Sequence, residues 1–170
     1  MLAFKLVVVG DYAVGKTTLI LNFTEHKFRE MYIPTIGVQF SVKDVMYEDE
    51  MVKLTVWDIA GQDEFKYVRT EFYKGASAII LVYDITREET LGNLDMWYKD
   101  VIKNAGEVPI IILGNKCDLE EKKAVSIEDA KKFVEKKNFK NVLDIVETSA
   151  KTSVNVEDAF LKIAESLANQ

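Results

Sequence analysis

The sequence has few of the side chains that form covalent cross-links or metal centres. Its 170 residues include one cysteine, Cys117, and one histidine, His26. A single cysteine excludes an internal disulfide and a cysteine-rich zinc site, and it is typical of proteins in a reducing compartment. No cysteine or carboxylate pattern around His26 implies a metal, so we expect a solvated histidine. These absences favour an intracellular protein.

Long hydrophobic runs and membrane-attachment signals are also missing. The longest apolar stretches, such as AIILVY at 78–83, fall well short of the roughly 18 residues that a membrane span needs. The amino-terminal segment MLAFKLVVVG is predicted to be a strand and does not resemble a signal peptide. Position 2 is Leu2, whereas myristoylation needs glycine there. The final ESLANQ has no cysteine that could be prenylated. We expect a protein in the cytoplasm or peripheral to membranes, with membrane contact only if a lipidated tail is missing from this chain.

An excess of basic charge is absent as well. The chain has 22 Lys and Arg against 28 Asp and Glu, a net charge of −6, whereas a general nucleic-acid binder shows a basic stripe or a high pI. We therefore expect no nucleic-acid partner. The length of 170 residues and the 48% apolar content suit one domain spanning 1–170.

The apolar residues alternate between two periods along the chain. Segments rich in β-branched and aliphatic residues alternate with segments whose apolar residues recur every three or four positions, which predicts an α/β fold of three layers with a six-stranded, mostly parallel sheet and about five helices. Acidic residues at 48–50 separate two alternating runs, so one strand should be antiparallel. The expected strands are 4–10, 37–47, 51–58, 77–84, 109–115 and 142–147, and the expected helices are 16–26, 64–74, 88–105, 126–137 and 155–168.

The stretch GDYAVGKT at 10–17 has the spacing of a phosphate-binding loop. A strand, KLVVV, precedes it and a helix, TTLILNF, follows it, which is the context that this pattern requires. Its backbone N–H groups can surround an anion, Lys16 can reach the outer phosphates, and the Thr17 hydroxyl can bind Mg²⁺. The pattern predicts a nucleotide polyphosphate without separating ATP from GTP. The candidate contacts here are Asp11, Tyr12, Ala13, Val14, Gly15, Lys16, Thr17 and Thr18.

A second motif, DIAGQ, ends the strand KLTVWD. Asp58 can hold Mg²⁺ through its water shell, and Gly61 offers a backbone N–H to a terminal phosphate. Gln62 can orient an attacking water because its amide both donates and accepts hydrogen bonds. With Lys16, Gln62 is our candidate catalytic residue.

Two further motifs, GNKCD and ETSAK, also follow strands, at the edge where open α/β sheets bind ligands. The Asp118 carboxylate can accept hydrogen bonds from a ring N–H and an exocyclic amino group, a pattern that guanine has and adenine lacks, which favours GTP. Lys116 and Lys151 have apolar stems that can cover the base, and the Ala150 N–H can meet a carbonyl oxygen. The candidate base contacts are Asn115, Lys116, Asp118, Leu119, Ser149, Ala150 and Lys151.

In this order, GDYAVGKT, PT, DIAGQ, NKCD and SAK resemble the motifs of small GTPases of the Ras superfamily, over essentially the whole chain. The resemblance implies a G domain that hydrolyses GTP slowly and acts as a Mg²⁺-dependent switch. It also implies that Thr35 is a metal ligand that senses the terminal phosphate, that Phe28 contacts the base edge-on, and that Tyr32 closes over the phosphates.

Within that superfamily the chain resembles the Rab branch most. IGVQF, KLTVWDIAGQDEF and FYKGASAIILVYDIT are similar to Rab stretches, and Phe40, Trp57 and Phe72 match the Rab aromatic cluster, with Phe72 where Rabs usually have tyrosine. The resemblance implies a monomer in vesicle trafficking or membrane-associated signalling. Its effectors, exchange factors and activators would bind the switch regions 30–40 and 60–75.

Tyr12 departs from the family pattern, which has glycine or serine at this position. A phenol there would crowd the path of an activator's arginine and alter hydrolysis, or it would turn outward and pack on a switch segment without effect. Two functions therefore remain open: a GTPase switch, and a GTP-holding interaction module with little turnover. The presence of Gln62 favours the enzyme.

Overall fold

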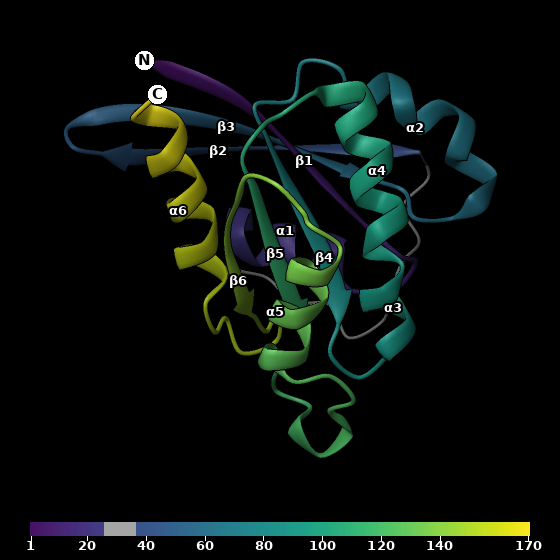
Figure 1. Cartoon of the computed structure of the whole chain (residues 1–170). Helices are drawn as coiled ribbons and strands as arrows, with labels where there is room; N and C mark the ends of the chain where they lie inside the picture. Colours follow the sequence, from purple (N-terminus) through teal and green to yellow (C-terminus); the bar gives the residue numbers. More distant parts are fainter. Residues whose placement is uncertain (26–36) are drawn as a thin grey trace.

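The computed structural model describes residues 1–25 and 37–170 (Figure 1). A six-stranded sheet forms its centre, in the order β2-β3-β1-β4-β5-β6. All neighbouring strands are parallel except β2 and β3, which pair antiparallel. The α/β fold with one antiparallel pair is therefore confirmed. The strands are β1 (Leu2–Gly10), β2 (Val38–Tyr47), β3 (Glu50–Ile59), β4 (Ala78–Asp84), β5 (Ile110–Asn115) and β6 (Val142–Glu147).

Helices cover the sheet on both faces, with α4 in front and α1 behind in Figure 1. This arrangement follows from alternation along the central strands: Leu6 and Val8 of β1 face one core, and Val7 and Val9 face the other. The first core packs on α1 and α6, and the second packs on α2 to α5. The helices are α1 (Lys16–Glu25), α2 (Lys66–Tyr73), α3 (Glu88–Gly92), α4 (Leu94–Ala105), α5 (Ile127–Lys136) and α6 (Val156–Ala168).

The expected helix over 88–105 is divided in the structure. α3 ends at Gly92, and α4 begins at Leu94, with Asn93 between them. The continuous apolar period across this segment concealed the break, because Leu91, Leu94 and Trp97 are all buried in the same core. The division matters for the site because Asn93 lies beside the phosphate loop.

Local chemistry explains where other elements begin. Ser126 starts α5 with a capping box, in which its hydroxyl accepts from the Asp129 N–H and the Asp129 carboxylate accepts from the Ser126 N–H. Glu48 and Asp49, with φ of 45° and 64°, form the two-residue turn between β2 and β3. Both positions agree with the predicted helix over 126–137 and with the predicted turn at 48–50.

The parallel strands bring their carboxyl ends to one edge of the sheet. β1 ends there in Gly10, β3 in the segment of Asp58, β4 in Asp84 and β5 in Asn115. Parallel sheets bind ligands at this edge. Among the helices that the structure describes, none has the length and hydropathy to cross a membrane.

Candidate functional site

The loop at 10–16 joins β1 to α1 and bends around an open centre. Its backbone has positive φ at Ala13 (64°) and Gly15 (98°), as in loops whose successive N–H groups bind an anion. A Cβ on Gly15 would lie 2.2 Å from Asn115 Nδ2, so only glycine fits there. Because α1 begins at Lys16, the loop N–H groups and the positive helix end face the same point.

Lys16 is nearly inaccessible to solvent. Its Nζ donates to the carbonyl oxygens of Gly10 and Asp11, each at 3.0 Å. Burial lowers the pKa of Lys16, although the charges of Asp58 and Asp11 partly oppose that effect. A buried ammonium held mainly by neutral carbonyls is poorly compensated, so a phosphate brought beside it would stabilise its charged form.

Thr17 and Asp58 bring two oxygen ligands together. The Thr17 hydroxyl donates to Asp58 Oδ2 at 2.5 Å, and Asp58 itself is 2% exposed. A hydroxyl and a carboxylate beside a phosphate-binding loop form the oxygen donor set that Mg²⁺ uses with nucleotides, which leaves its other positions for phosphate and water. The residues present therefore fit the ion.

Gly61 and Gln62 lie against the phosphate loop. A Cβ on Gly61 would lie 2.5 Å from the Gly10 oxygen and 2.8 Å from the Tyr12 nitrogen, so a glycine is needed for this close approach. Gln62 follows in extended conformation and precedes the short helix Asp63–Phe65. Its Oε1 is buried and accepts no hydrogen bond within the described part of the chain. The acceptor of this amide is therefore unused by the described residues, and it would reach a water only after the side chain turns.

A cavity of about 370 Å³ opens beside the loop. The Asp118 carboxylate at its wall accepts a hydrogen bond from the Ser149 hydroxyl at 2.7 Å. One carboxylate oxygen therefore has a fixed partner, which holds the group in place. The cavity is lined by Thr18, Asn115, Lys116, Asp118, Leu119, Ala150 and Lys151.

Asn115 connects this cavity to the phosphate loop. Its Nδ2 donates to the Val14 oxygen at 3.0 Å, and its Oδ1 accepts from the Ala150 N–H at 3.3 Å. The Ala150 N–H, which we expected to meet a base oxygen, is thus directed to Asn115 in this structure. Through Asn115, the two parts of the candidate site form one continuous surface.

Asp84, a fully buried carboxylate at the end of β4, also belongs to this region and was not predicted from the sequence. Lys116 Nζ lies 2.9 Å from Asp84 Oδ2 and also donates to the Ala13 oxygen. Burial by itself would raise the pKa of Asp84, but hydrogen bonds from Thr86 and Lys116 and the charge of Lys116 hold it below its ordinary value. The signal was available, since Asp84 ends an apolar strand as Asp58 does.

Three side chains from outside the motifs also bind the loop, and no sequence pattern predicted any of these contacts. Asn93 Nδ2 and Trp97 Nε1 donate to the two carboxylate oxygens of Asp11, at 2.7 Å and 2.8 Å. The Asp11 side chain is thus directed to α4, and its backbone is the part available to a nucleotide. Arg87 Nη2 donates to the Tyr12 oxygen at 2.9 Å. These contacts fix the outer side of the loop.

Three candidate residues, Phe28, Tyr32 and Thr35, lie outside the described residues, as does His26. The aromatic cluster expected between the switch regions is present. Phe40 contacts Trp57 edge-on with ring centroids 4.5 Å apart, and Trp57 lies 6.2 Å from Phe72. Phe40 is 57% exposed, so the cluster forms part of the surface.

Comparison with known proteins agrees with this arrangement. A family model described as the Ras family matches residues 5–169. Ras-related protein Rab-13 of Rattus norvegicus is 45% identical over 165 residues, 96% of this chain and 79% of that protein. Rab-1C of Dictyostelium discoideum is 41% identical over 164 residues, 96% of this chain and 80% of that protein. Rab-8 of Diplobatis ommata is 41% identical over 165 residues, 96% of this chain and 77% of that protein.

Proposed function

Because the chain belongs to the Ras family of small GTPases, which bind and hydrolyse GTP, we propose that it is a Rab-like switch whose nucleotide binds along the carboxyl edge of the sheet. The observation that carries this proposal is the position of Asn115. It contacts Val14 in the phosphate loop and lines the cavity that Asp118 closes. A nucleoside polyphosphate has the same layout, a base joined to a row of phosphates.

The phosphate half of the site has the parts that GTP hydrolysis needs. Lys16 binds the outer phosphates and stabilises charge as the terminal phosphoryl group departs, and the loop N–H groups stabilise the inner phosphates. Thr17 and Asp58 hold Mg²⁺, which supplies further charge stabilisation at the phosphates when bound. Gln62 orients the water that attacks the terminal phosphate. The family resemblance assigns a further metal contact to Thr35.

The base half of the site selects guanine. Asp118 accepts from the ring N–H and the exocyclic amino group, and Ser149 holds the carboxylate that does so. The apolar stems of Lys116 and Lys151 cover the faces of the ring. Adenine lacks this pair of donors, so the partly buried Asp118 carboxylate would gain no hydrogen bond from the base in an ATP complex.

Switching follows from the contact between Gly61 and the phosphate loop. A terminal phosphate at the loop draws in the Gly61 N–H, and its departure releases the segment that follows, so partners that bind 30–40 and 60–75 can distinguish the two states. We assign effectors, exchange factors and activators to these segments. We also place the single G domain, 1–170, in the cytoplasm or at the periphery of membranes, as a monomer in vesicle trafficking.

The base assignment is tested by Asp118→Asn. An amide at this position presents an N–H where xanthine has a carbonyl oxygen, so preference should move from GTP toward xanthosine triphosphate by at least about tenfold, or about 1.4 kcal/mol. Competition between the two nucleotides for the wild type and the variant measures this ratio.

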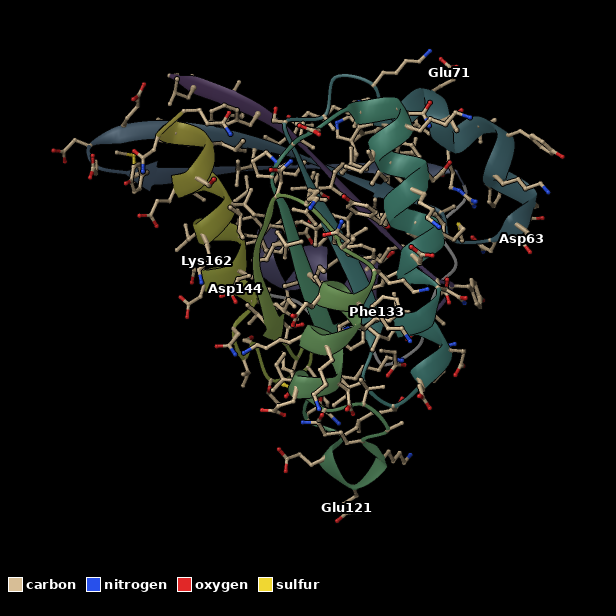
Figure 2. The ribbon with its side chains drawn as sticks, viewed as in Figure 1. Asp63, Glu71, Glu121, Phe133, Asp144 and Lys162 are labelled. Atoms are coloured by element: carbon tan, nitrogen blue, oxygen red, sulfur yellow. The ribbon has the colours of Figure 1, made fainter. Side chains whose placement is uncertain are left out.

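Asp144→Asn is the matched control. Asp144 lies in β6 and pairs with Lys162 of α6, as Figure 2 shows, and it takes no part in the cavity. The same chemical change there should leave the ratio unaltered. If Asp118→Asn also left the ratio unaltered, Asp118 would not bind the base.

A further inference from the structure

Arg69 is a buried cation on α2, in the segment that follows Gln62. It is 4% exposed, although arginine is seldom so buried without a specific role. Its Nη1 donates to the carbonyl oxygen of Gln62 at 3.0 Å. Figure 2 shows this segment, which runs from the labelled Asp63 toward Glu71 beside α4.

The guanidinium of Arg69 also lies on the ring of Trp97. Its central carbon is 4.5 Å from the ring centroid, a cation–π contact that favours the planar guanidinium. Trp97 is 1% exposed in α4, and its N–H is the donor to Asp11 of the phosphate loop. One indole therefore contacts the phosphate loop through its edge and Arg69 through its face.

The carbonyl of Gln62 is held from two sides. The Phe65 N–H donates to it at 3.1 Å, and Arg69 provides the second donor. With Gly61 close to the Tyr12 nitrogen, these contacts restrict the peptide on both sides of the Gln62 Cα. The fixed backbone therefore limits where the side chain of Gln62 can point. The Oε1 of this side chain is buried and accepts no hydrogen bond from the described residues.

We propose that Arg69, supported on the Trp97 ring, is a positioning residue for GTP hydrolysis that fixes Gln62 relative to the phosphate loop. The chain of contacts Asp11–Trp97–Arg69–Gln62 makes α4 the common support of the loop that holds the phosphates and the residue that orients the water. Displacement of a catalytic group by about 1 Å can cost two orders of magnitude in rate, so such support has a measurable effect. This inference rests on the role assigned to Gln62 in the proposed function.

A double-mutant cycle tests it. Arg69→Met keeps the stem on Trp97 and removes the donor to Gln62, and it should lower single-turnover hydrolysis of preloaded GTP by about tenfold or more. Gln62→Ala retains the carbonyl that Arg69 binds but removes the side chain that Arg69 positions. In the Gln62→Ala background, Arg69→Met should therefore change the rate by less than about twofold.

Two further variants separate positioning from folding. Trp97→Phe keeps a ring beneath Arg69 and removes the donor to Asp11, and it should lower the rate about threefold, again only when Gln62 is present. Lys99→Met changes a cation in the same groove between α2 and α4 that bonds only Asp95 among the described residues, and it should match the wild type. Nucleotide retention and thermal unfolding are measured for each variant. If Arg69→Met does not retain GTP, Arg69→Leu, which also lacks a donor, replaces it in the cycle.

The possible results distinguish a failure of the positioning role of Arg69 from a failure of the proposed GTPase function. An equal loss from Arg69→Met in both backgrounds, or a wild-type rate for that variant, overturns the inference and leaves the GTPase assignment intact. A wild-type rate for Gln62→Ala overturns the inference together with the catalytic role of Gln62. Absence of GTP hydrolysis by the wild-type protein would count against the proposed function itself.

Discussion

Tyr12 is the residue at which this phosphate loop differs most from a loop of small side chains. It is 42% exposed, and its carbonyl is held by Arg87, whose guanidinium also pairs with Asp84. Arg87 is thus engaged in fixing the loop. An arginine that completes the transition state would come from an activator and would have to pass Tyr12.

Tyr12→Gly should therefore alter stimulation more than basal turnover. We expect basal hydrolysis of the order of 10⁻⁴ s⁻¹, changed less than about tenfold by the substitution, because Lys16 and Gln62 are retained. Stimulation by an activator that supplies an arginine can reach about 10³ to 10⁵, and it should rise markedly in the variant. Single-turnover hydrolysis with and without a Rab activator measures both; equal stimulation of the two proteins would mean that the ring lies clear of the arginine's path.

At the scale of elements, the phosphate loop is constrained by close packing against β5 as well as by its dihedral angles. Gly15 and Gly106 both have positive φ, 98° and 81°, but only Gly15 lies against another side chain, that of Asn115. An alanine at either position would be strained in its backbone, but only at Gly15 would it also clash with a neighbouring side chain.

Gly15→Ala should consequently lose nucleotide affinity, whereas Gly106→Ala should not. At Gly106, which follows α4 with φ 81° and ψ −165°, the added methyl meets nothing within 4 Å, so only backbone strain of about 1–3 kcal/mol is expected in the free energy of unfolding. At Gly15 the methyl would displace Asn115 and open the loop. Titration with GDP and urea unfolding measure the two effects; comparable GDP affinity in both variants would show that the loop tolerates a larger residue.

Some features of the fold and of the site could be predicted from the sequence, and others could not. The alternating periods predicted the sheet and its antiparallel pair, and strand-end motifs predicted most of the side chains that line the cavity. Thr18 lines it as well, and Ser149, which was expected there, instead bonds Asp118. The contacts of Asp11 with Asn93 and Trp97 could not be predicted, because they join side chains more than 80 positions apart that no local pattern relates. The break at Asn93 was missed for a related reason: burial on both sides preserves the helical period through it.

At the scale of the whole molecule, Asp84 connects the stability of the fold to pH. It is fully buried between Lys116 and Arg87, and its pKa lies below its ordinary value. A carboxyl group whose pKa is lowered by folding contributes stability at pH values above its unfolded pKa of about 3.9, and this contribution is lost as pH falls through the folded pKa. Asp84 should therefore contribute fully at neutral pH.

Asp84→Asn should lower the free energy of unfolding at about pH 7 by about 1–3 kcal/mol, since both cations are partly exposed and their interaction with Asp84 is screened. The difference from the wild type should begin to shrink as pH falls below about 4, the unfolded pKa, and should be lost as pH falls through the lower pKa of the folded state. Urea unfolding over this pH range, at saturating GDP, measures the difference. A difference that stayed constant with pH would mean that the charge of Asp84 does not stabilise the fold.

A terminal phosphate, acting through Gly61, should order the segment that follows this residue. Amide hydrogen exchange tests this most directly, on one preparation loaded with GDP or with a non-hydrolysable GTP analogue. Residues 61–73 should exchange at least about tenfold more slowly with the GTP analogue, while β4 and β5 should exchange equally in both states. Equal exchange of 61–73 in the two states would contradict it.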